Sequence, residues 1–175
     1  IPTFGIIGSR NQVNSHFIGE LASNWASSGE GILKIVGGIC LDPHLIERAS
    51  NCPNIELCGA VDETETFYAS VDVCVNPICV GTGLKIKTVE ALAAGVPVIG
   101  TQEGFAGLPA SSDFHQLSDS SELVKACNRY VHDIAFREEV RTSSAAVADA
   151  YHAAVTAQVD ELVDRIRKHM VTIKA

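Results

Sequence analysis

The sequence predicts a doubly wound α/β fold with a parallel, Rossmann-like sheet, on three observations. Short runs rich in Val, Ile and Leu alternate with longer stretches that have helical periodicity. The short runs are apolar throughout, as strands are when helices cover both faces of a sheet. The length of 175 residues, 46% of them hydrophobic, suits one compact domain. We expect a single Rossmann-like domain over residues 1–175, with the α/β core in 1–132 and helices in 133–175.

The predicted strands and helices alternate along the core. Strands are expected near Thr3–Gly8, Leu33–Gly37, Ile55–Gly59, Val71–Val75, Pro97–Gly100 and Phe114–Leu117. Helices are expected near Ser15–Ser27, Pro43–Ser50, Glu63–Ser70, Leu84–Ala94 and Ser121–His132. Strands joined by helical crossovers run parallel, because each helix returns the chain to the edge of the sheet from which it started.

The C-terminal quarter of the chain is predicted to be helical. No strand pattern returns after His132, and residues 134–170 have helical character with a candidate break near Thr142–Ser144. An apolar stripe recurs there at helical spacing. It consists of Val155, Val159, Leu162, Val163 and Ile166. Two interpretations stay open: the stripe packs on this same sheet, or it docks on a second domain outside this chain.

Charge and hydropathy exclude two classes of partner. The net charge is −8, and residues 1–124 hold five Lys or Arg against fourteen Asp or Glu. A nucleic-acid surface would need a broad basic stripe, so we expect no nucleic-acid partner. No apolar run reaches the roughly 20 residues of a membrane span, and the chain opens without a basic leader, so we expect a cytoplasmic protein. An opening without Met is also typical of a fragment.

The six cysteines favour burial over cross-linking or metal binding. They lie at positions 40, 52, 58, 74, 79 and 127, and no CxxC occurs. Most fall within or beside apolar runs, so we expect small buried hydrophobic side chains. Cys52 and Cys58 are the pair that a structure must check for a disulfide.

Two loops that follow predicted strands carry candidate binding residues, because ligands of open parallel sheets bind beyond the carboxyl ends of the strands. After the first strand, Gly8 allows close backbone approach, and Ser9 or Asn14 can cap the next helix. Arg10 supplies a cation there. After the third strand, the exposed backbone of Gly59–Val61 can contact the edge of a base. Plain turns explain both loops equally well.

The helix after the third-strand loop has its own start signal. Asp62 or Thr64 can cap it, and Glu65 lies three residues after Asp62, as in a capping box.

The stretch "GTGLKIKTVEALAAGVPVIG", residues 81–100, is the most informative. Gly81 and Gly83 indicate a loop, and Thr82 is a candidate N-cap for a helix that begins near residue 84. Lys85 and Lys87 then lie in the first helical turn, where the helix dipole makes each exposed cation cost about 0.3 to 1 kcal/mol. A bound phosphate reverses that penalty, since free N–H groups and both ammonium groups would hold it together. Two solvated surface lysines are the alternative.

Glu90 interrupts an apolar run one turn further along the same helix. A carboxylate beside apolar side chains needs a partner. Lys87 is one candidate, as an ion pair, and the two hydroxyls of a ribose are another. At 1.5 Å per residue, Glu90 lies roughly 5 to 8 Å beyond the two lysines along the helix axis, a spacing that suits one nucleoside diphosphate.

These residues resemble the donor-binding half of group 1 (family 4) glycosyltransferases. The resemblance lies in "NPICVGTGLKIKTVEALAAGVPVIGTQEGFAGL", with the upstream segments "IIGSRNQVN", "LKIVGG" and "NIELCGAVDETETFYASVDVCVNP" in the family's order. It covers about residues 3–132. It implies a GT-B fold, in which two Rossmann-like domains face each other and the C-terminal one binds a nucleotide-sugar.

The resemblance also implies roles for the candidate residues. Glu90 would hold the ribose, Lys85 or Lys87 with Arg10 the diphosphate, and the Gly59–Asp62 loop the base. The Gly81–Gly83 loop would lie beside the donor. The sugar would pass with retention to a glycan, lipid or small-molecule acceptor bound by an N-terminal domain, without a cofactor or metal. The last helix would cross back onto that domain.

The sequence departs from the family pattern at three places. Many members have a glutamate at the position of Thr82 and another at the position of Ala106. Many also have both an Arg and a Lys in the first loop, where this chain has Arg10 and Asn14. These losses put the contacts to the donor sugar in doubt. Three other classes stay open: a nucleotide-sugar epimerase of the same architecture, a receiver-like or flavodoxin-like regulatory module, and a purely structural domain.

Overall fold

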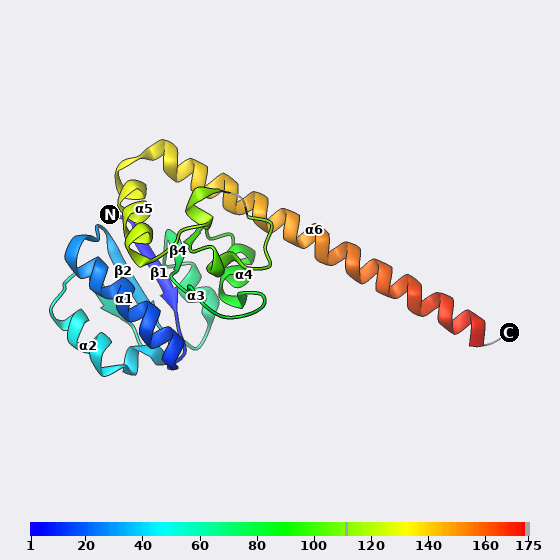
Figure 1. Ribbon diagram of the computed structural model, residues 1–175, viewed down its shortest axis with the longest axis horizontal. Helices are drawn as coiled ribbons and strands as arrows, with labels where there is room; N and C mark the ends of the chain where they lie inside the picture. The colour runs from blue at the N-terminus through cyan, green and yellow to red at the C-terminus, as the bar shows by residue number, and fades with distance from the viewer. Residues whose placement is uncertain (111, 174–175) are drawn as a thin grey trace.

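A computed structural model describes residues 1–110 and 112–173, and its core is a five-stranded, all-parallel sheet (Figure 1). The strand order is β3-β2-β1-β4-β5. The strands are β1 (Thr3–Ile7), β2 (Ile32–Val36), β3 (Ile55–Leu57), β4 (Val73–Asn76) and β5 (Val98–Gly100). Every pairing between neighbouring strands is parallel, which confirms the predicted doubly wound α/β class.

Among the described residues, six α-helices and three short 3-10 helices connect and cover the strands. The α-helices are α1 (Gln12–Ser28), α2 (Pro43–Ser50), α3 (Thr64–Tyr68), α4 (Ile86–Ala93), α5 (Ser120–His132) and α6 (Ile134–Ile173). The 3-10 helices are η1 (Gly38–Leu41), η2 (Glu103–Phe105) and η3 (Asp113–His115). Side-chain caps start four of the described α-helices: Asn11 begins α1, Asp42 begins α2, Asp119 begins α5 and Asp133 begins α6.

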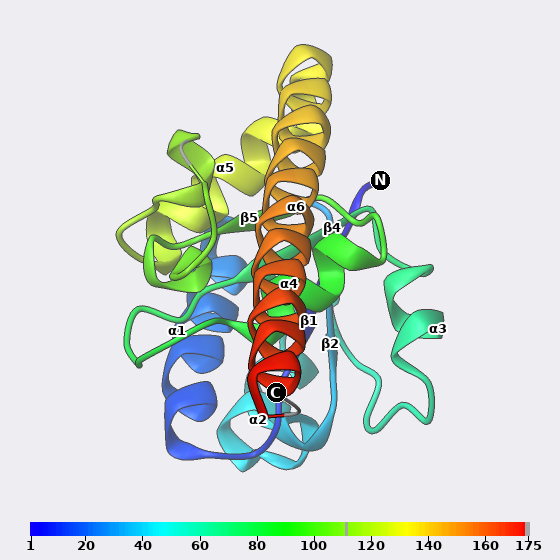
Figure 2. The ribbon, with the colours of Figure 1, turned by 90° about the vertical axis from the view of Figure 1, so that its right-hand side faces the viewer.

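The sheet buries apolar side chains on both faces, as the sequence predicts. One cluster joins residues of all five strands to α1, α2, α5 and the first part of α6, and a second joins residues of β1, β2, β4 and β5 to α3, α4 and α6. Figure 2 shows α1 and α3 on opposite sides of the strands. Strand residues alternate between the faces: Phe4 and Ile6 of β1 belong to the first cluster, whereas Ile7 packs against the second.

The predicted sixth strand at Phe114–Leu117 is wrong. Residues Asp113–His115 form η3, and Leu117 alone makes an isolated parallel bridge to Thr101. The neighbours Phe114 and His115 are both buried. The 3-10 turn brings Phe114 against Phe136 and stacks His115 on Phe105, with ring centroids 5.4 and 4.2 Å apart.

Several predicted helix starts are also wrong. Asn11, rather than Ser9 or Asn14, caps α1, and its side chain accepts a 2.9 Å hydrogen bond from the Asn14 backbone N–H. Helix α4 begins at Ile86, with Lys85 at the N-cap position and no side-chain cap, so Thr82 does not cap it. Helix α3 likewise has no side-chain cap, so the predicted capping box from Asp62 does not form.

Helix α6 is a single helix of 40 residues, without the predicted break. The polar residues near 142–144 are accommodated within it: the Thr142 hydroxyl donates to the Glu138 carbonyl oxygen at 2.9 Å, and Ser144 Oγ accepts from the Val98 N–H at 3.0 Å. Phe136, Val140 and Val147 are buried against the body. The first part of α6 is therefore anchored on β5, α4 and α5.

The second part of α6 extends away from the body (Figure 1). All side chains described from 152 to 169 are exposed, and the predicted stripe from Val155 to Ile166 is 36–55% exposed. The interpretation that this stripe packs on the same sheet is wrong. Docking on a second domain stays a prediction, and residues 174 and 175 lie outside the described residues. No helix in the described part of the chain is apolar enough over a sufficient length to cross a membrane.

The cysteine prediction is confirmed for four of the six residues. Cys40, Cys52, Cys74 and Cys127 are buried, whereas Cys58 is exposed and Cys79 is partly buried. All six are free thiols, so Cys52 and Cys58 do not form a disulfide.

Ending the chain after residue 156 should leave the melting temperature within about 2 °C of that of the full chain, because the removed side chains are exposed and bury little apolar area. Val140→Ala, in the anchored part of the same helix, should instead lower the free energy of unfolding by about 2 kcal/mol. Thermal and urea unfolding measure both. A large loss of stability on truncation would mean that the distal half of α6 folds back onto the body.

His115 should make the fold sensitive to acid. Burial lowers the pKa of His115 from 6.5 to about 4, so only the unfolded chain gains a proton between these values. The contribution of neutral His115 to the free energy of unfolding is therefore fully present above about pH 6.5. About 3 kcal/mol of that free energy is lost as the pH falls to about 4. His115→Leu should flatten this part of the stability profile, measured by urea unfolding at each pH. His152→Gln, which removes an exposed imidazole, is the matched control, and a His115→Leu profile parallel to the wild type would contradict the assignment.

Candidate functional site

A cleft of about 810 Å³ lies at the carboxyl edge of the sheet, between the start of α1 and the start of α4. Its volume falls within the range of about 300 to 1,000 Å³ that is typical of small-molecule sites. Its lining consists of Asn11, Gln12, Val13, Asn14, Asn76, Ile78, Leu84, Lys85, Ile86 and Lys87. The predicted edge of the sheet and the predicted helix therefore do form a cavity, and both lysines contribute to its wall.

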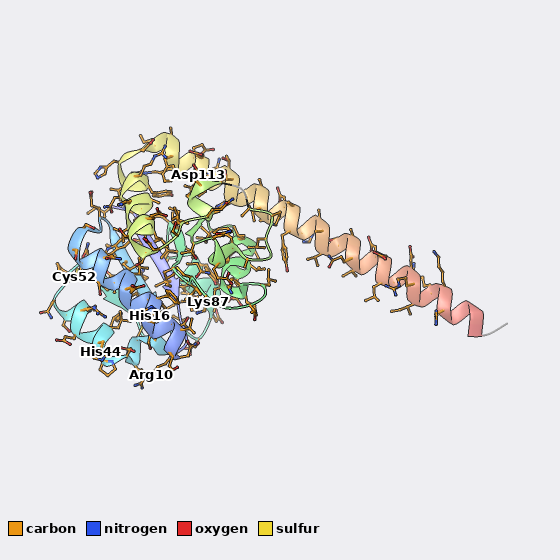
Figure 3. The ribbon with its side chains drawn as sticks, viewed as in Figure 1. Arg10, His16, His44, Cys52, Lys87 and Asp113 are labelled. Carbon is orange, nitrogen blue, oxygen red and sulfur yellow. The ribbon has the colours of Figure 1, made fainter. Side chains whose placement is uncertain are left out.

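Lys87 carries a positive charge that the protein leaves largely uncompensated. Its Nζ lies 3.4 Å from Asn14 Oδ1, and no ion pair to it occurs among residues 1–110 and 112–173. Burial lowers the pKa of Lys87, and the negative charge of Glu90 partly opposes this effect. Figure 3 shows Lys87 toward the interior of the body, with Arg10 at its rim. An anion in the cleft would supply the missing charge partner, as the sequence analysis expected of a phosphate.

Lys85 is already neutralised by the protein itself. Its Nζ lies 2.7 Å from Glu103 Oε1 of η2, and the two side chains are only 13% and 29% exposed. A Cβ added at Gly81 would come within 3.0 Å of Lys85 Nζ, so the preceding loop lies close to this ammonium group. For Lys85, the unfavourable interaction with the helix dipole that the sequence predicted is therefore offset by Glu103. For Lys87, no ion pair in the described ranges offsets it.

A buried hydrogen-bond network positions the start of α4 against the loop that follows β5. Asn76, the last residue of β4, donates from Nδ2 to Thr88 Oγ1 at 2.9 Å, and Thr88 Oγ1 donates to the Gly104 carbonyl oxygen at 2.6 Å. The Gly104 N–H donates in turn to Thr101 Oγ1 at 2.9 Å. A Cβ at Gly104 would lie 3.1 Å from the Asn76 side chain, so the close approach favours glycine there.

Glu90 lies one turn beyond Lys87 on α4 and is exposed. Its Oε2 accepts a hydrogen bond of 3.3 Å from the Tyr68 hydroxyl. Burial, followed by the electrostatic effect of the neighbouring Cys74 and Glu90, raises the pKa of Tyr68 well above its ordinary value, so the hydroxyl keeps its proton. The ion pair between Glu90 and Lys87, which the sequence left as the alternative to a ribose partner, does not form. The carboxylate is held by Tyr68 and remains open to solvent.

The first loop lines the cleft through Asn11 and Asn14, and side-chain hydrogen bonds brace it. The Asn14 side chain donates from Nδ2 to the Ser9 carbonyl oxygen at 2.7 Å, and Asn11 donates from Nδ2 to Ser9 Oγ at 3.0 Å. A Cβ at Gly8 would lie 2.8 Å from the Ile18 side chain, so tight packing requires glycine there. Arg10 is exposed and lies outside the cleft lining.

The loop after β3 lies at the same sheet edge but outside the lining of the cleft. The Gly37 N–H donates to the Gly59 carbonyl oxygen at 2.6 Å, and Gly59 has a φ of +73°, which favours glycine. Val61 packs against the second core cluster. Gly81, Thr82 and Gly83 are exposed and also outside the lining.

The structure thus brings Lys85 and Lys87 together with residues that the sequence analysis did not select. Asn76, Thr88 and Glu103 are the additions. A weak signal existed for two of them, since Asn76 ends an apolar strand and Thr88 interrupts the apolar face of a helix. Glu103 resembles any acidic loop residue, and only the fold places it beside Lys85. No group of three or more His, Cys, Asp or Glu able to hold a metal ion occurs in the described ranges.

Comparison with known proteins gives one family. The family model described as "Glycosyl transferases group 1" matches residues 2–133, the same stretch over which the sequence resembles that family. No curated protein is similar enough in sequence to count as a match.

Solved structures share the fold at low sequence identity. The HepE protein of Anabaena, determined in complex with UDP and glucose, has a TM-score of 0.69 and 15% identity over 93% of this chain and 48% of its own. The C-terminal domain of LpcC, a group 1 family glycosyl transferase of Francisella tularensis, has a TM-score of 0.67 and 15% identity over 86% of both chains. This chain therefore spans about half the length of HepE.

A third structure extends the comparison. The catalytic domain of the cholesterol-α-glucosyltransferase of Helicobacter pylori has a TM-score of 0.61 and 15% identity over 85% of this chain and 98% of its own. At such identities, the likeness shows a common fold.

Removing the Thr88 hydroxyl should destabilise the fold at the cleft. Thr88→Val keeps the shape of the side chain but leaves the Gly104 carbonyl and the Asn76 amide with only their long hydrogen bond of 3.4 Å to each other, so we expect the free energy of unfolding to fall by about 2 kcal/mol. Thr142→Val is the matched control, because that hydroxyl is exposed and bonds only within α6. Urea unfolding measures both, and equal effects would contradict a special role for the buried network.

Proposed function

The chain belongs to the group 1 glycosyl transferases, and from that membership and the cleft at the start of α4 we propose that it binds the nucleotide-sugar donor of a glycosyltransferase. The family resemblance seen in the sequence is thereby confirmed. Assignment to family 4, retention of configuration, the cytoplasmic location and the absence of a metal requirement stay parts of the proposal. The observation that carries it is Lys87, a partly buried ammonium group with no counter-ion in the described chain, in the wall of a ligand-sized cleft.

The diphosphate of the donor would lie over the start of α4. The first N–H groups of a helix have no partner within the helix, and the dipole favours an anion there. Lys87 adds a full charge, and Asn14 Oδ1 holds its ammonium group at the edge of the cleft. An anion at this point would satisfy both the helix and the lysine. The proposal therefore assigns the diphosphate to Lys87 first, with Lys85 and Arg10 as more distant cations.

The ribose would lie further along α4, beside Glu90. The carboxylate is exposed, and Tyr68 donates to one of its oxygens, so acceptor capacity remains for two ribose hydroxyls. Glu90 is three residues beyond Lys87, or about 4.5 Å along the helix axis, which suits the offset between a diphosphate and its ribose. The base would then contact the backbone of the Gly59–Val61 loop.

Related structures support a uridine nucleotide as the first donor to test. HepE was determined in complex with UDP and glucose and, separately, with UDP-glucose. With 13–15% identity between the chains, that support comes from analogy of fold. UDP-glucose is accordingly the first probe, and other bases and sugars are the alternatives.

The acceptor would bind to a second domain outside this chain. The chain corresponds to about half of HepE, and the distal stripe of α6 is an exposed apolar face that such a domain would cover. We therefore expect this chain alone to bind nucleotides without catalysing transfer. An epimerase would instead interconvert sugars without an acceptor, and incubation with the bound nucleotide-sugar tests that alternative directly.

Titration calorimetry with UDP, GDP and ADP tests the site. At least one nucleotide should bind, and Lys87→Gln should weaken its binding by about tenfold or more, because a charge-assisted contact is lost. Glu90→Gln should weaken nucleotide binding but leave inorganic pyrophosphate binding unchanged, since pyrophosphate has no ribose. Lys125→Gln, at an exposed position of α5, is the matched control. Absence of heat with all three nucleotides, or equal binding by Lys87→Gln, would refute the proposed site.

A further inference from the structure

The ion pair between Lys85 and Glu103 sets the charge that the cleft presents to a ligand. Lys85 and Lys87 bring two positive charges to the start of α4, and Glu103 cancels one of them at a distance of 2.7 Å. We propose that Glu103 is a specificity-determining residue, which tunes the site to the diphosphate of a nucleotide-sugar and against the free nucleoside diphosphate. This inference rests on the proposed function.

Glu103 acts on the ligand through Lys85 rather than by contact. Lys85 belongs to the cleft wall, whereas Glu103 does not, and the two side chains are joined by an ion pair of 2.7 Å. Glu103 is therefore a positioning residue for the Lys85 ammonium group and a fixed negative charge near the phosphate end of the cleft.

The protein holds this pair in place more firmly than an ordinary surface ion pair. The residue after Glu103 is Gly104, whose N–H and carbonyl bind Thr101 and Thr88 at 2.9 and 2.6 Å within the buried network. The lysine side chain is 13% exposed, so solvent screens the pair only in part. A pair fixed in this way keeps Lys85 neutralised whether or not a ligand is present, and Lys87 supplies the remaining positive charge.

The two ligands of a transfer reaction differ in charge at this end. A free nucleoside diphosphate carries about three negative charges near neutral pH, whereas its sugar ester carries about two, because the terminal phosphate is then a diester. A site with a second free ammonium would favour the more highly charged product. By neutralising Lys85, Glu103 reduces that preference, which helps the donor to compete with the product left after transfer.

A cycle of variants tests the inference. The quantity measured by calorimetry is the Kd for UDP divided by the Kd for UDP-glucose, or the same ratio for GDP and GDP-mannose if guanine is the preferred base. Glu103→Gln frees the Lys85 charge, so UDP should bind more tightly and the ratio should fall by roughly fivefold. Lys85→Gln leaves Glu103 unpaired, so the ratio should rise by a similar factor.

The double variant Lys85→Gln/Glu103→Gln removes both charges and should return the ratio to within about twofold of the wild type. Both shifts should shrink when salt is raised from about 0.05 to about 0.5 M, which a purely structural effect would not do. Glu138→Gln removes the same charge from an exposed ion pair with Arg141 on α6 and is the matched control. Melting temperatures establish that each variant is folded.

Three outcomes would overturn the inference while leaving the proposed function intact. The first is a ratio that does not change in either single variant. The second is a Glu103→Gln variant that binds UDP-glucose more weakly and UDP unchanged, which would place the carboxylate on the sugar. The third is a double variant that binds neither ligand well, which would make Lys85 a direct phosphate ligand. A wild-type chain that binds none of the nucleotides would refute the proposed function, and the inference with it.

Discussion

The buried amide of Asn76, at the end of β4, is the constraint on which the candidate site depends. It donates to Thr88 on α4, and Thr88 donates to the Gly104 carbonyl after β5. One side chain thereby fixes the first turns of a helix and the loop that carries Glu103. Because these groups are buried, each must keep its partner, and the network has little freedom to rearrange. The positions of Lys85 and Lys87 follow from this arrangement.

The two lysines of the α4 start solve the same electrostatic problem differently. Both lie where the helix dipole disfavours a cation. Lys85 is neutralised by Glu103, whereas Lys87 keeps its charge in a partly buried position with one long contact to Asn14. Lys85 thereby stabilises the folded chain, whereas Lys87 retains an unfavourable interaction with the helix dipole. Such retained strain is typical of binding sites.

Much of the fold could be predicted from the sequence, because parallel strands covered on both faces leave a clear apolar pattern. Strands β1 to β5 follow in the predicted order, and α2 has its predicted bounds. The errors arise where tertiary contacts outweigh local pattern. The segment Phe114–Leu117 has the composition of a strand, but in the structure Phe114 packs on Phe136 and His115 stacks on Phe105 from a 3-10 turn. Ser144 suggests a break in α6, yet its hydroxyl binds the backbone of β5.

The candidate site could be predicted only in part. Lys85, Lys87 and Glu90 are recognisable because a charge in the wrong place on a helix is visible in sequence. Glu103 is invisible there, since it lies eighteen positions after Lys85 and has no local signal. Asn11 and Asn14 of the first loop line the cleft, whereas Arg10 and the Gly59–Val61 loop lie outside its lining. Whether a loop residue reaches the cleft depends on loop geometry, which residue type alone does not determine.

The unbroken course of α6 has a mechanical consequence. Its first half is fastened to β5 through Ser144, and its far half projects about 25 Å at 1.5 Å per residue. A partner domain bound to the projecting half would be linked through the rigid helix α6 to β5, the strand that precedes the loop containing Glu103. A tilt of the distal part of α6 would therefore displace the cleft entrance, although the two lie far apart.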